Sequence, residues 1–219
     1  MALGLSKATG TGTMTCERAG TPAGAATAPG MRPRLVVGMS GSSAPQLCIA
    51  FLQRLRELAS VETHFVMSEG AARCLALEAG ADPGWMRSLA DVSYEPGDLG
   101  AAISSGSFLT IGMVVIPCSM RSLAAIATGN TQDLLSRAAD VSLKERRRLV
   151  LVTREAPLNL IHLRNMETVT LAGATVLPPV LAFYHRPETV DDLLSQIVGK
   201  VLDQFDIEHR LFSRWGEGG

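Results

Sequence analysis

The stretch Arg34-Leu-Val-Val-Gly-Met-Ser-Gly-Ser-Ser-Ala-Pro-Gln46 combines an apolar run, a cluster of small residues and the beginning of a helical pattern. We interpret it as a strand, a tight turn and a helix start. Gly38 and Gly41 let the backbone turn closely, and Pro45 suits the first helical position, where no amide hydrogen is needed. The amides and the dipole at such a helix start favour an anion such as a phosphate. Many turns of this kind bind nothing, so the stretch alone leaves the anion site open.

Short apolar runs alternate with longer helical patterns along the rest of the chain. Several runs are continuously apolar, which is typical of strands buried on both faces of a parallel sheet. The expected strands are residues 35–37, 64–67, 113–116, 149–152 and 175–177, and the expected helices are residues 45–59, 69–79, 120–139 with a break near Gly129, 158–172 and 189–205. This order predicts a single α/β domain with a Rossmann-like, doubly wound parallel sheet.

Composition and charge narrow the class of protein. The chain has 219 residues, of which 47% are hydrophobic and 19% charged, enough for one domain with a substantial core. Its net charge of -1 gives no general case for binding nucleic acid. The basic run 144–148 contains a glutamate and leads into an apolar run, so we interpret it as a solvated turn. No stretch approaches the roughly 20 apolar residues that a membrane-spanning helix requires.

The cysteines are scattered without a Cys-x-x-Cys pair, which argues against a disulfide framework and against a zinc site. They are Cys16, Cys48, Cys74 and Cys118. The histidines show no ligand spacing either, and we expect structural roles for them. These features predict a reduced, cytoplasmic compartment.

Residues 1–30 differ from the rest of the chain in composition. Alanine, glycine, threonine and proline dominate, charges are few, and no apolar run is long enough for a secretory signal. We predict a flexible leader over residues 1–30 and a folded domain over residues 31–219.

Polar residues follow four of the apolar runs, and ligands of doubly wound sheets bind beyond the carboxyl ends of the strands. The segments are residues 40–43, Ser68, residues 117–122 and residues 154–157. Hydroxyl groups, two arginines and one carboxylate are therefore expected to form an anion-binding rim. Helix capping is enough to explain the presence of Ser68 or of Ser119 when each is considered alone. Capping does not explain why an arginine and a glutamate stand side by side at 154–155.

Seven motifs, in this order along residues 34–217, resemble those of the UbiX-like flavin prenyltransferases. They are Gly-Met-Ser-Gly-Ser-Ser at 38–43, Ser-Ser-Gly-Ser at 104–107, Pro-Cys-Ser at 117–119, Arg-Ala-Ala-Asp-Val-Ser-Leu-Lys-Glu-Arg-Arg at 137–147, Arg-Glu-Ala-Pro at 154–157, Phe-Tyr-His-Arg-Pro at 183–187 and Arg-Trp-Gly at 214–216. The resemblance implies a metal-independent transferase that joins the dimethylallyl group of dimethylallyl phosphate to N5 and C6 of reduced FMN. The product, prenylated FMN, would serve a partner UbiD-type decarboxylase. A homo-oligomer, commonly a dodecamer with sites at subunit contacts, is also implied.

The same resemblance implies the residues of the site. The catalytic positions are Ser43, Glu78 and Glu155. The flavin-binding positions are Gly41, Ser42, Ser43, Ser68, Ser119, Met120, Arg121, Ser122 and Arg154. The positions around the prenyl phosphate are Arg137, Lys144, Glu155, Tyr184, Lys200 and Trp215, several of which family members supply across a subunit contact.

The implied chemistry asks for these residue types. Breaking an allylic carbon–oxygen bond leaves a phosphate anion, whose growing charge Arg137, Lys144 and Lys200 could stabilise. Closing the second bond at C6 requires loss of a ring proton. Glu155 could relay that proton or give one to the departing phosphate, and Ser43 could hydrogen-bond flavin N5.

The chain departs from the family in three places. Ala44, followed by Pro45, replaces the usual glycine and should stiffen the helix start. Lys200 stands where many members carry arginine, so the charge is kept while the bidentate fork is lost. Residues 92–100 lack a tryptophan that some members carry. Without the resemblance, surface or packing roles explain every site residue except Arg154 and Glu155.

Three other functions compete with this interpretation. The related FMN-dependent cysteine decarboxylases carry Pro-Ala-Ser-Ala-Asn-Thr and Met-Asn-x-x-Met-Trp segments, which this sequence lacks. A direct aromatic acid decarboxylase would need a carboxylate-binding pair, and none is evident beyond the phosphate site. An FMN-binding carrier or chaperone would need the rim but none of Lys144, Glu155, Tyr184 and Lys200.

Overall fold

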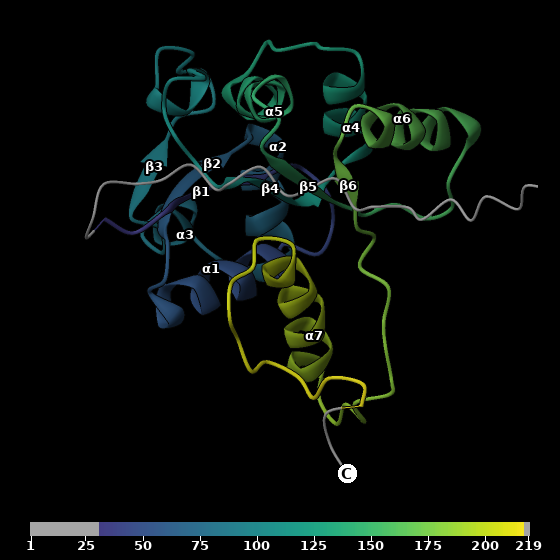
Figure 1. Cartoon of the computed structure of the whole chain (residues 1–219). Coiled ribbons are helices and arrows are strands. Elements are labelled where there is room, and N and C mark those ends of the chain that lie inside the picture. Colours follow the sequence, from purple (N-terminus) through teal and green to yellow (C-terminus); the bar gives the residue numbers. More distant parts are fainter. Residues whose placement is uncertain (1–30, 217–219) are drawn as a thin grey trace, which may run out of the picture.

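A parallel sheet of six strands forms the centre of the computed structural model, which describes residues 31–216 (Figure 1). The strands are β1 (Arg34–Met39), β2 (Glu62–Met67), β3 (Val92–Tyr94), β4 (Gly112–Cys118), β5 (Arg148–Thr153) and β6 (Thr175–Val176). The helices are α1 (Gln46–Leu58), α2 (Glu69–Cys74), α3 (Pro83–Arg87), α4 (Met120–Ala127), α5 (Leu134–Lys144), α6 (Leu160–Leu171) and α7 (Val190–Asp203). The predicted leader, residues 1–30, lies outside the described residues.

The strand order β3-β2-β1-β4-β5-β6 confirms the doubly wound sheet. The chain winds from β1 outward to β3, then crosses back so that β4 pairs with β1 on its other side. The order therefore reverses between β1 and β4, the point where such sheets bind their ligands. The register pairs Met39 with Met67 and Cys118 with Thr153, so these strand ends share one edge.

Helices cover both faces of the sheet. Figure 1 shows α1 and α7 below the sheet and α4, α5 and α6 above it. Phe51 of α1 and Val198 of α7 are fully buried on one face, as are Leu123 of α4 and Ala139 of α5 on the other. Two covered faces explain why several strands are continuously apolar. No helix within residues 31–216 is long and apolar enough to cross a membrane.

The long helical pattern predicted at 120–139 is two helices, with the predicted break at Gly129, whose φ is 66°. Ser119 and Asp133 begin the two helices by accepting backbone amides of their first turns. The second helix continues to Lys144, beyond the predicted end. The short elements β3 and α3 were not predicted, because three or five residues are too few to show a periodicity.

The basic run 144–148 is only partly the solvated turn that the sequence suggested. Arg147 donates hydrogen bonds to the carbonyls of Gly106 and Phe108, and Arg148 donates to the carbonyl of Gln204 at 2.9 Å. Both guanidinium groups therefore hold loops at the amino edge of the sheet, while Lys144 remains exposed.

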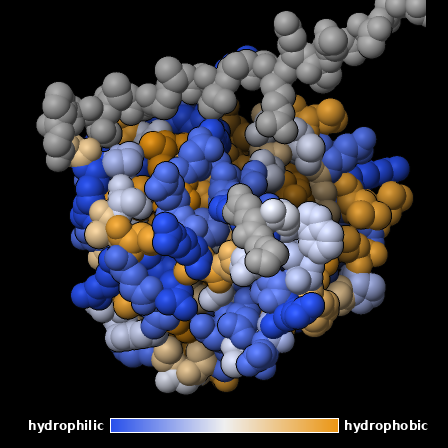
Figure 2. All heavy atoms as spheres, turned by 60° about the horizontal axis from the view of Figure 1, so that its bottom comes forward, coloured by the Kyte–Doolittle hydropathy of each residue, from blue (hydrophilic) through white to orange (hydrophobic). Residues whose placement is uncertain are grey.

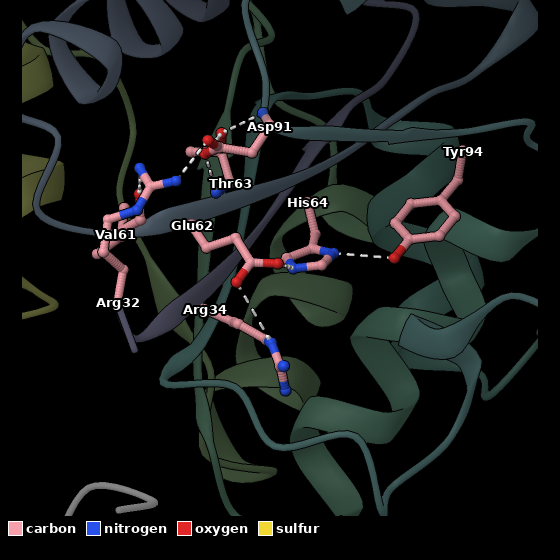
Figure 3. A network of polar contacts seen from close by, with 8 residues as sticks. All are labelled: Arg32, Arg34, Val61, Glu62, Thr63, His64, Asp91 and Tyr94. Atoms are coloured by element: carbon pink, nitrogen blue, oxygen red, sulfur yellow. Dashed lines mark hydrogen bonds and ion pairs between the residues drawn. The ribbon is translucent and has the colours of Figure 1, made fainter. Parts of the chain in front are cut away.

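Polar side chains tie the first three strands together near their amino ends (Figure 3). Asp91 accepts hydrogen bonds from the backbone and hydroxyl of Thr63 at 2.8 and 2.9 Å, and from Arg32 at 2.6 Å. The buried His64 ring lies between Glu62 and Tyr94, with nitrogen–oxygen distances of 3.0 and 2.8 Å. This arrangement agrees with the structural role expected for His64.

Asp91 should contribute a pH-dependent part of the stability. Burial alone would raise its pKa, but the hydrogen bonds from Thr63 and Arg32 outweigh burial and hold the pKa below the ordinary value. The stabilisation is therefore complete above the unfolded pKa near 4 and is lost as pH falls through the folded pKa. We expect Asp91→Asn to lower the free energy of unfolding by about 1 kcal/mol at pH 7.

Urea unfolding between pH 2.5 and 7 measures this effect, and the difference between wild type and Asp91→Asn should shrink as the pH falls below about 4. Glu208→Gln, at an exposed position, is the control. A constant difference across the whole pH range would contradict the assignment.

Candidate active site at the carboxyl edge of the sheet

Ser40 fastens the turn after β1 to the end of β4. Its buried hydroxyl donates to the carbonyl of Pro117 at 3.0 Å and accepts the amide of Ser119 at 2.7 Å. The next serine, Ser42, donates from its hydroxyl to the carbonyl of Arg154 at 2.9 Å. The turn is thereby fixed against the ends of β4 and β5, and the predicted convergence of these strand ends is observed.

Gly41 lies directly against the beginning of α2. A Cβ built on Gly41 would approach the backbone carbon atoms of Gly70 to 2.8 and 2.9 Å, closer than real Cβ contacts. Because the obstacle is backbone, it cannot move aside as a side chain would. Only glycine fits here, and the turn can therefore close on the amino end of α2.

Ser43 and Glu78 form a direct pair. Glu78 lies on η1 (Leu75–Ala79), a turn of π-helix that continues α2. One oxygen of its carboxylate accepts the Ser43 hydroxyl at 2.8 Å and the Ala44 amide at 3.0 Å. These two hydrogen bonds, with the nearby charge of Arg154, hold the pKa of Glu78 below its ordinary value. Glu78 is therefore ionised at neutral pH and orients the Ser43 hydroxyl.

The Glu78 contact also changes the expected anion site. The sequence suggested that the amides of this helix start would be available to a phosphate. The amide of Ala44 is instead taken by the Glu78 carboxylate. An anion bound at this edge must therefore use other donors of the rim.

The other serines of the rim cap helices. Ser68 accepts the amide of Ala71 at 3.1 Å, and Ser119 accepts the amide of Ser122 at 3.2 Å. Met120, Arg121 and Ser122 form the first turn of α4. Capping thus accounts for the positions of Ser68 and Ser119, and flavin binding by the α4 turn stays a prediction.

Arg154 and Glu155 extend from the end of β5, and both are exposed. The amide of Arg154 donates to the carbonyl of Cys118 at 3.1 Å, which continues the pairing of β4 and β5 past the strand end. Glu155 accepts the amide of Ala156 at 3.1 Å. Within residues 31–216, no ion pair joins Glu155 to Arg154, so the carboxylate does not serve mainly to hold that arginine.

Two of the predicted prenyl-phosphate residues, Arg137 and Lys144, lie on α5. Arg137 donates to the carbonyl of Ser104 at 3.2 Å and pairs with Asp140 at 2.9 Å. Lys144 ends α5 and pairs with Glu145. Because β5 begins only four residues later, Lys144 lies near the amino edge, roughly 15–20 Å from Glu155 across a six-residue strand.

The remaining three predicted residues lie on α7 or on the segments before and after it. The rings of Tyr184 and Trp215 contact edge to face, with their centroids 5.9 Å apart. Lys200 lies in the last turn of α7, with its ammonium 3.6 Å from Asp203. Arg148, the first residue of β5, binds the carbonyl of Gln204, so the end of α7 also lies toward the amino edge.

The predicted site residues thus form three groups in one chain. The rim at the carboxyl edge holds the flavin-binding set with Ser43, Glu78 and Glu155. The α5 group holds Arg137 and Lys144, and the α7 group holds Tyr184, Lys200 and Trp215. No hydrogen bond, ion pair or ring contact within residues 31–216 links one group to another.

Sequence reasoning missed two residues that organise these groups. Ser40 was counted only as one more hydroxyl of the rim, although its place directly after β1 could have indicated a link between strands. Asp203 had no signal in the sequence, because His209 and Arg214, which bind it, lie on a tail without periodicity. Within residues 31–216, no cluster of histidine, cysteine, aspartate and glutamate could hold a metal ion.

Comparison with known proteins assigns this architecture. Residues 26–202 match the model of the Flavoprotein family. The flavin prenyltransferase UbiX of Escherichia coli K12 is 50% identical over 184 residues, covering 83% of this chain and 97% of the relative. A probable UbiX-like flavin prenyltransferase of Streptomyces sp. strain D7 is 50% identical over 182 residues, covering 83% of this chain and 91% of the relative.

Two solved structures agree with these relatives. The crystal structure of AnUbiX (PadA1) in complex with FMN and dimethylallyl pyrophosphate has a TM-score of 0.82 and 51% identity, covering 84% of this chain and 98% of that one. A dodecameric FMN-dependent UbiX-like decarboxylase from Escherichia coli O157:H7 has a TM-score of 0.80 and 51% identity, covering 83% of this chain and 98% of that one.

The fold and the rim define a flavoprotein of the doubly wound α/β class. Within that class, the chain belongs to the UbiX-like flavin prenyltransferase family. The FMN-dependent cysteine decarboxylase TvaF, at 14% identity and a TM-score of 0.58, shares the fold alone.

Ala44, which replaces the usual glycine of the family, should lower the stability of the protein. Its φ of 71° is in the left-handed region, which is unfavourable for a residue with a Cβ by about 1–2 kcal/mol. Glycine removes that strain but gives the unfolded chain more freedom, which offsets about 0.4–1 kcal/mol. We expect Ala44→Gly to raise the free energy of unfolding by up to about 1.6 kcal/mol.

Urea unfolding tests this expectation, with Ala50→Gly as the matched control. Ala50 lies inside α1, where glycine should destabilise the protein by about 1 kcal/mol. Equal destabilisation by both substitutions would contradict the strain assigned to Ala44.

Proposed function

We propose that this chain joins the dimethylallyl group of a prenyl phosphate to N5 and C6 of reduced FMN, and that the rim at the carboxyl edge is its flavin site. The observation that carries the proposal is the Ser43–Glu78 pair beside Arg154 and Glu155, in a chain of this family. FMN supplies the nucleophilic ring atoms of the reaction when it is bound. The surrounding residues would bind the two substrates, orient them and move the proton.

The rim has the features that a flavin phosphate and ring require. Gly41 keeps the turn close to α2 and leaves no side chain in the way. The starts of α2 and α4, capped by Ser68 and Ser119, direct the positive ends of two helices toward this edge. The exposed guanidinium of Arg154 adds a cation. We expect Gly41, Ser42 and the first turn of α4, residues 120–122, to contact the flavin.

Glu78 and Ser43 would act as a unit. The ionised carboxylate accepts a hydrogen bond from the Ser43 hydroxyl, which turns the lone pairs of the hydroxyl oxygen toward the rim. Ser43 can then accept a hydrogen bond from a flavin N–H and fix the orientation of N5. Glu155, exposed and without an ion pair to Arg154, is the group that can take the ring proton from C6 or protonate the departing phosphate.

The prenyl phosphate would be held by residues of more than one copy of the chain. Arg137 and Lys144, with Tyr184 and Lys200, carry the charges and the hydroxyl that a phosphate needs, but no hydrogen bond or ion pair within residues 31–216 joins them to the rim in a single chain. Large hydrophobic side chains are also exposed on the surface, among them Ile161 at 68% and Phe183 at 67%. Figure 2 shows hydrophobic and hydrophilic residues interspersed on one face. The chain is therefore proposed to form a homo-oligomer, and a dodecamer by analogy with the dodecameric relative.

Three finer points belong to the same proposal. The solved relative is described with dimethylallyl pyrophosphate, whereas the sequence led us to dimethylallyl phosphate, so both are tested as donors. A UbiD-type decarboxylase is the proposed user of the product. A cytoplasmic location stays a prediction.

The decisive experiment is anaerobic incubation of the purified protein with reduced FMN and either prenyl donor. Mass spectrometry should detect a flavin heavier by one five-carbon unit. A carrier would bind FMN without forming this product, and an aromatic acid decarboxylase would instead release carbon dioxide from an aryl acid. Either result without the heavier flavin would overturn the proposal.

Glu155→Gln separates catalysis from flavin binding. Glutamine keeps the size and shape of the side chain but cannot exchange the proton. We expect bound FMN to stay near the wild-type amount while prenylation slows by a factor of about 10² to 10⁴. Single-turnover kinetics with both substrates saturating measures the step, and Glu167→Gln on the exposed part of α6 is the control. Turnover at the wild-type rate would remove Glu155 from the chemistry.

Mixed oligomers test whether two copies build one site. Lys144→Ala and Glu155→Gln should each be nearly inactive alone. After the subunits are dissociated and reassembled together in equal amounts, about one quarter of the sites should combine intact groups from two copies. Activity should recover to that extent in the mixture. Mixing Glu155→Gln with Ser43→Ala, two changes in the same rim, should restore nothing, and recovery no greater than this control would contradict the shared site.

A further inference from the structure

The C-terminal tail, residues 204–216, packs back along α7. A Cβ built on Gly199 would approach ring atoms of Phe212 and His209 to 2.5 and 2.6 Å. The tail rings therefore lie against the backbone of α7 at Gly199, where any larger residue would displace both. Beyond this contact the tail reaches Trp215, whose ring meets Tyr184. The tail thus brings a predicted site residue, Trp215, against Tyr184 in the segment that precedes α7.

One carboxylate, that of Asp203, fastens the tail to the helix. Its oxygens accept two hydrogen bonds from the Arg214 guanidinium, at 2.6 and 3.0 Å, and one contact from His209 at 3.1 Å. The Lys200 ammonium lies 3.6 Å away. The ion pair between Arg214 and Asp203 is bidentate, and two parallel hydrogen bonds of this kind are among the strongest that a carboxylate accepts. Asp203 therefore joins the last turn of α7 to the residue directly before Trp215.

The electrostatics of Asp203 suit this role. Burial alone would raise its pKa, but hydrogen bonds from Arg214 and His209 outweigh burial and keep the pKa below its ordinary value. The carboxylate is thus charged at neutral pH, with its side chain only 19% exposed. Lys200 is 48% exposed and lies at ion-pair rather than hydrogen-bond distance. Its ammonium can therefore keep this position while donating hydrogen bonds to an incoming anion.

We propose that Asp203 is a positioning residue of the prenyl-phosphate site. It docks the tail through Arg214, which brings Trp215 against Tyr184, and it orients Lys200 in the same group. The proposal rests on the proposed function, because that function gives Tyr184, Lys200 and Trp215 their role toward the prenyl phosphate. A tail contact that served stability alone would not affect binding of one substrate more than the other.

Asp203→Asn in the full-length, FMN-loaded protein tests the proposal. Asparagine keeps the size of the side chain but loses the charge and one acceptor of the arginine fork. We expect KM for the prenyl donor to rise about tenfold or more, as for a lost charge-assisted hydrogen bond, while the dissociation constant of reduced FMN changes less than about twofold. Asp191→Asn is the matched control, since Asp191 lies on the first turn of α7 and pairs with Arg54 instead.

Trp215 provides a second readout that needs no turnover. The chain has two tryptophans, so Trp85→Phe leaves Trp215 as the only one. In that background, Asp203→Asn should weaken the binding of dimethylallyl phosphate measured by the fluorescence of Trp215. Arg214→Ala should reproduce this effect, and the double variant should be no worse than either single one, because both residues belong to one interaction.

The outcomes separate the alternatives. Unchanged donor binding in Asp203→Asn would overturn the proposal, whether or not the tail is released. Equal weakening of FMN and donor binding would also overturn it, since that pattern indicates a general structural defect. If the wild type binds the donor at the Asp203-dependent site but makes no prenylated flavin, the proposed function fails while the positioning role of Asp203 stands.

Discussion

The hydrogen bonds of Ser40 join the two halves of the sheet at the point where the strand order reverses. Neither half could define the site alone, because the turn after β1 and the start of α4 belong to opposite windings of the chain. The buried hydroxyl holds Pro117 and Ser119 against that turn. Ser42 then reaches Arg154, so the ends of three neighbouring strands become one rigid surface.

The charges at this surface are arranged locally rather than by the net charge of the chain. Glu78 occupies the Ser43 hydroxyl and the Ala44 amide, and it stays ionised because these donors face it. The same logic recurs at Asp203, whose charge is kept by an arginine and a histidine. In both places the hydrogen bonds that the carboxylate accepts orient neighbouring groups, namely Ser43 beside Glu78 and Arg214 beside Asp203. Glu155, by contrast, has no ion pair to Arg154 within residues 31–216, and proton transfer is its proposed role.

The division of the predicted residues into three groups links activity to assembly. A six-residue strand separates the edge that carries Glu155 from the edge near Lys144. Side chains cannot span that length, so Lys144 and Glu155 of one chain cannot meet around a single phosphate. In the proposed oligomer, each copy would offer its rim to one neighbour and its cations to another. Folding and catalysis would then depend on the same contacts.

The sequence by itself determined the sheet, the paired helices and the rim, because each rests on local patterns: apolar runs, capping serines, and small residues directly after strands. It also indicated the Ser43, Glu78 and Glu155 positions through its resemblance to a family. Only the tertiary structure decided that Ser43 bonds Glu78, that Lys144 lies at the far edge from Glu155, and that Asp203 binds Arg214. These facts depend on contacts between residues far apart in the chain, and no periodicity of the sequence records the direction in which a side chain meets a distant partner.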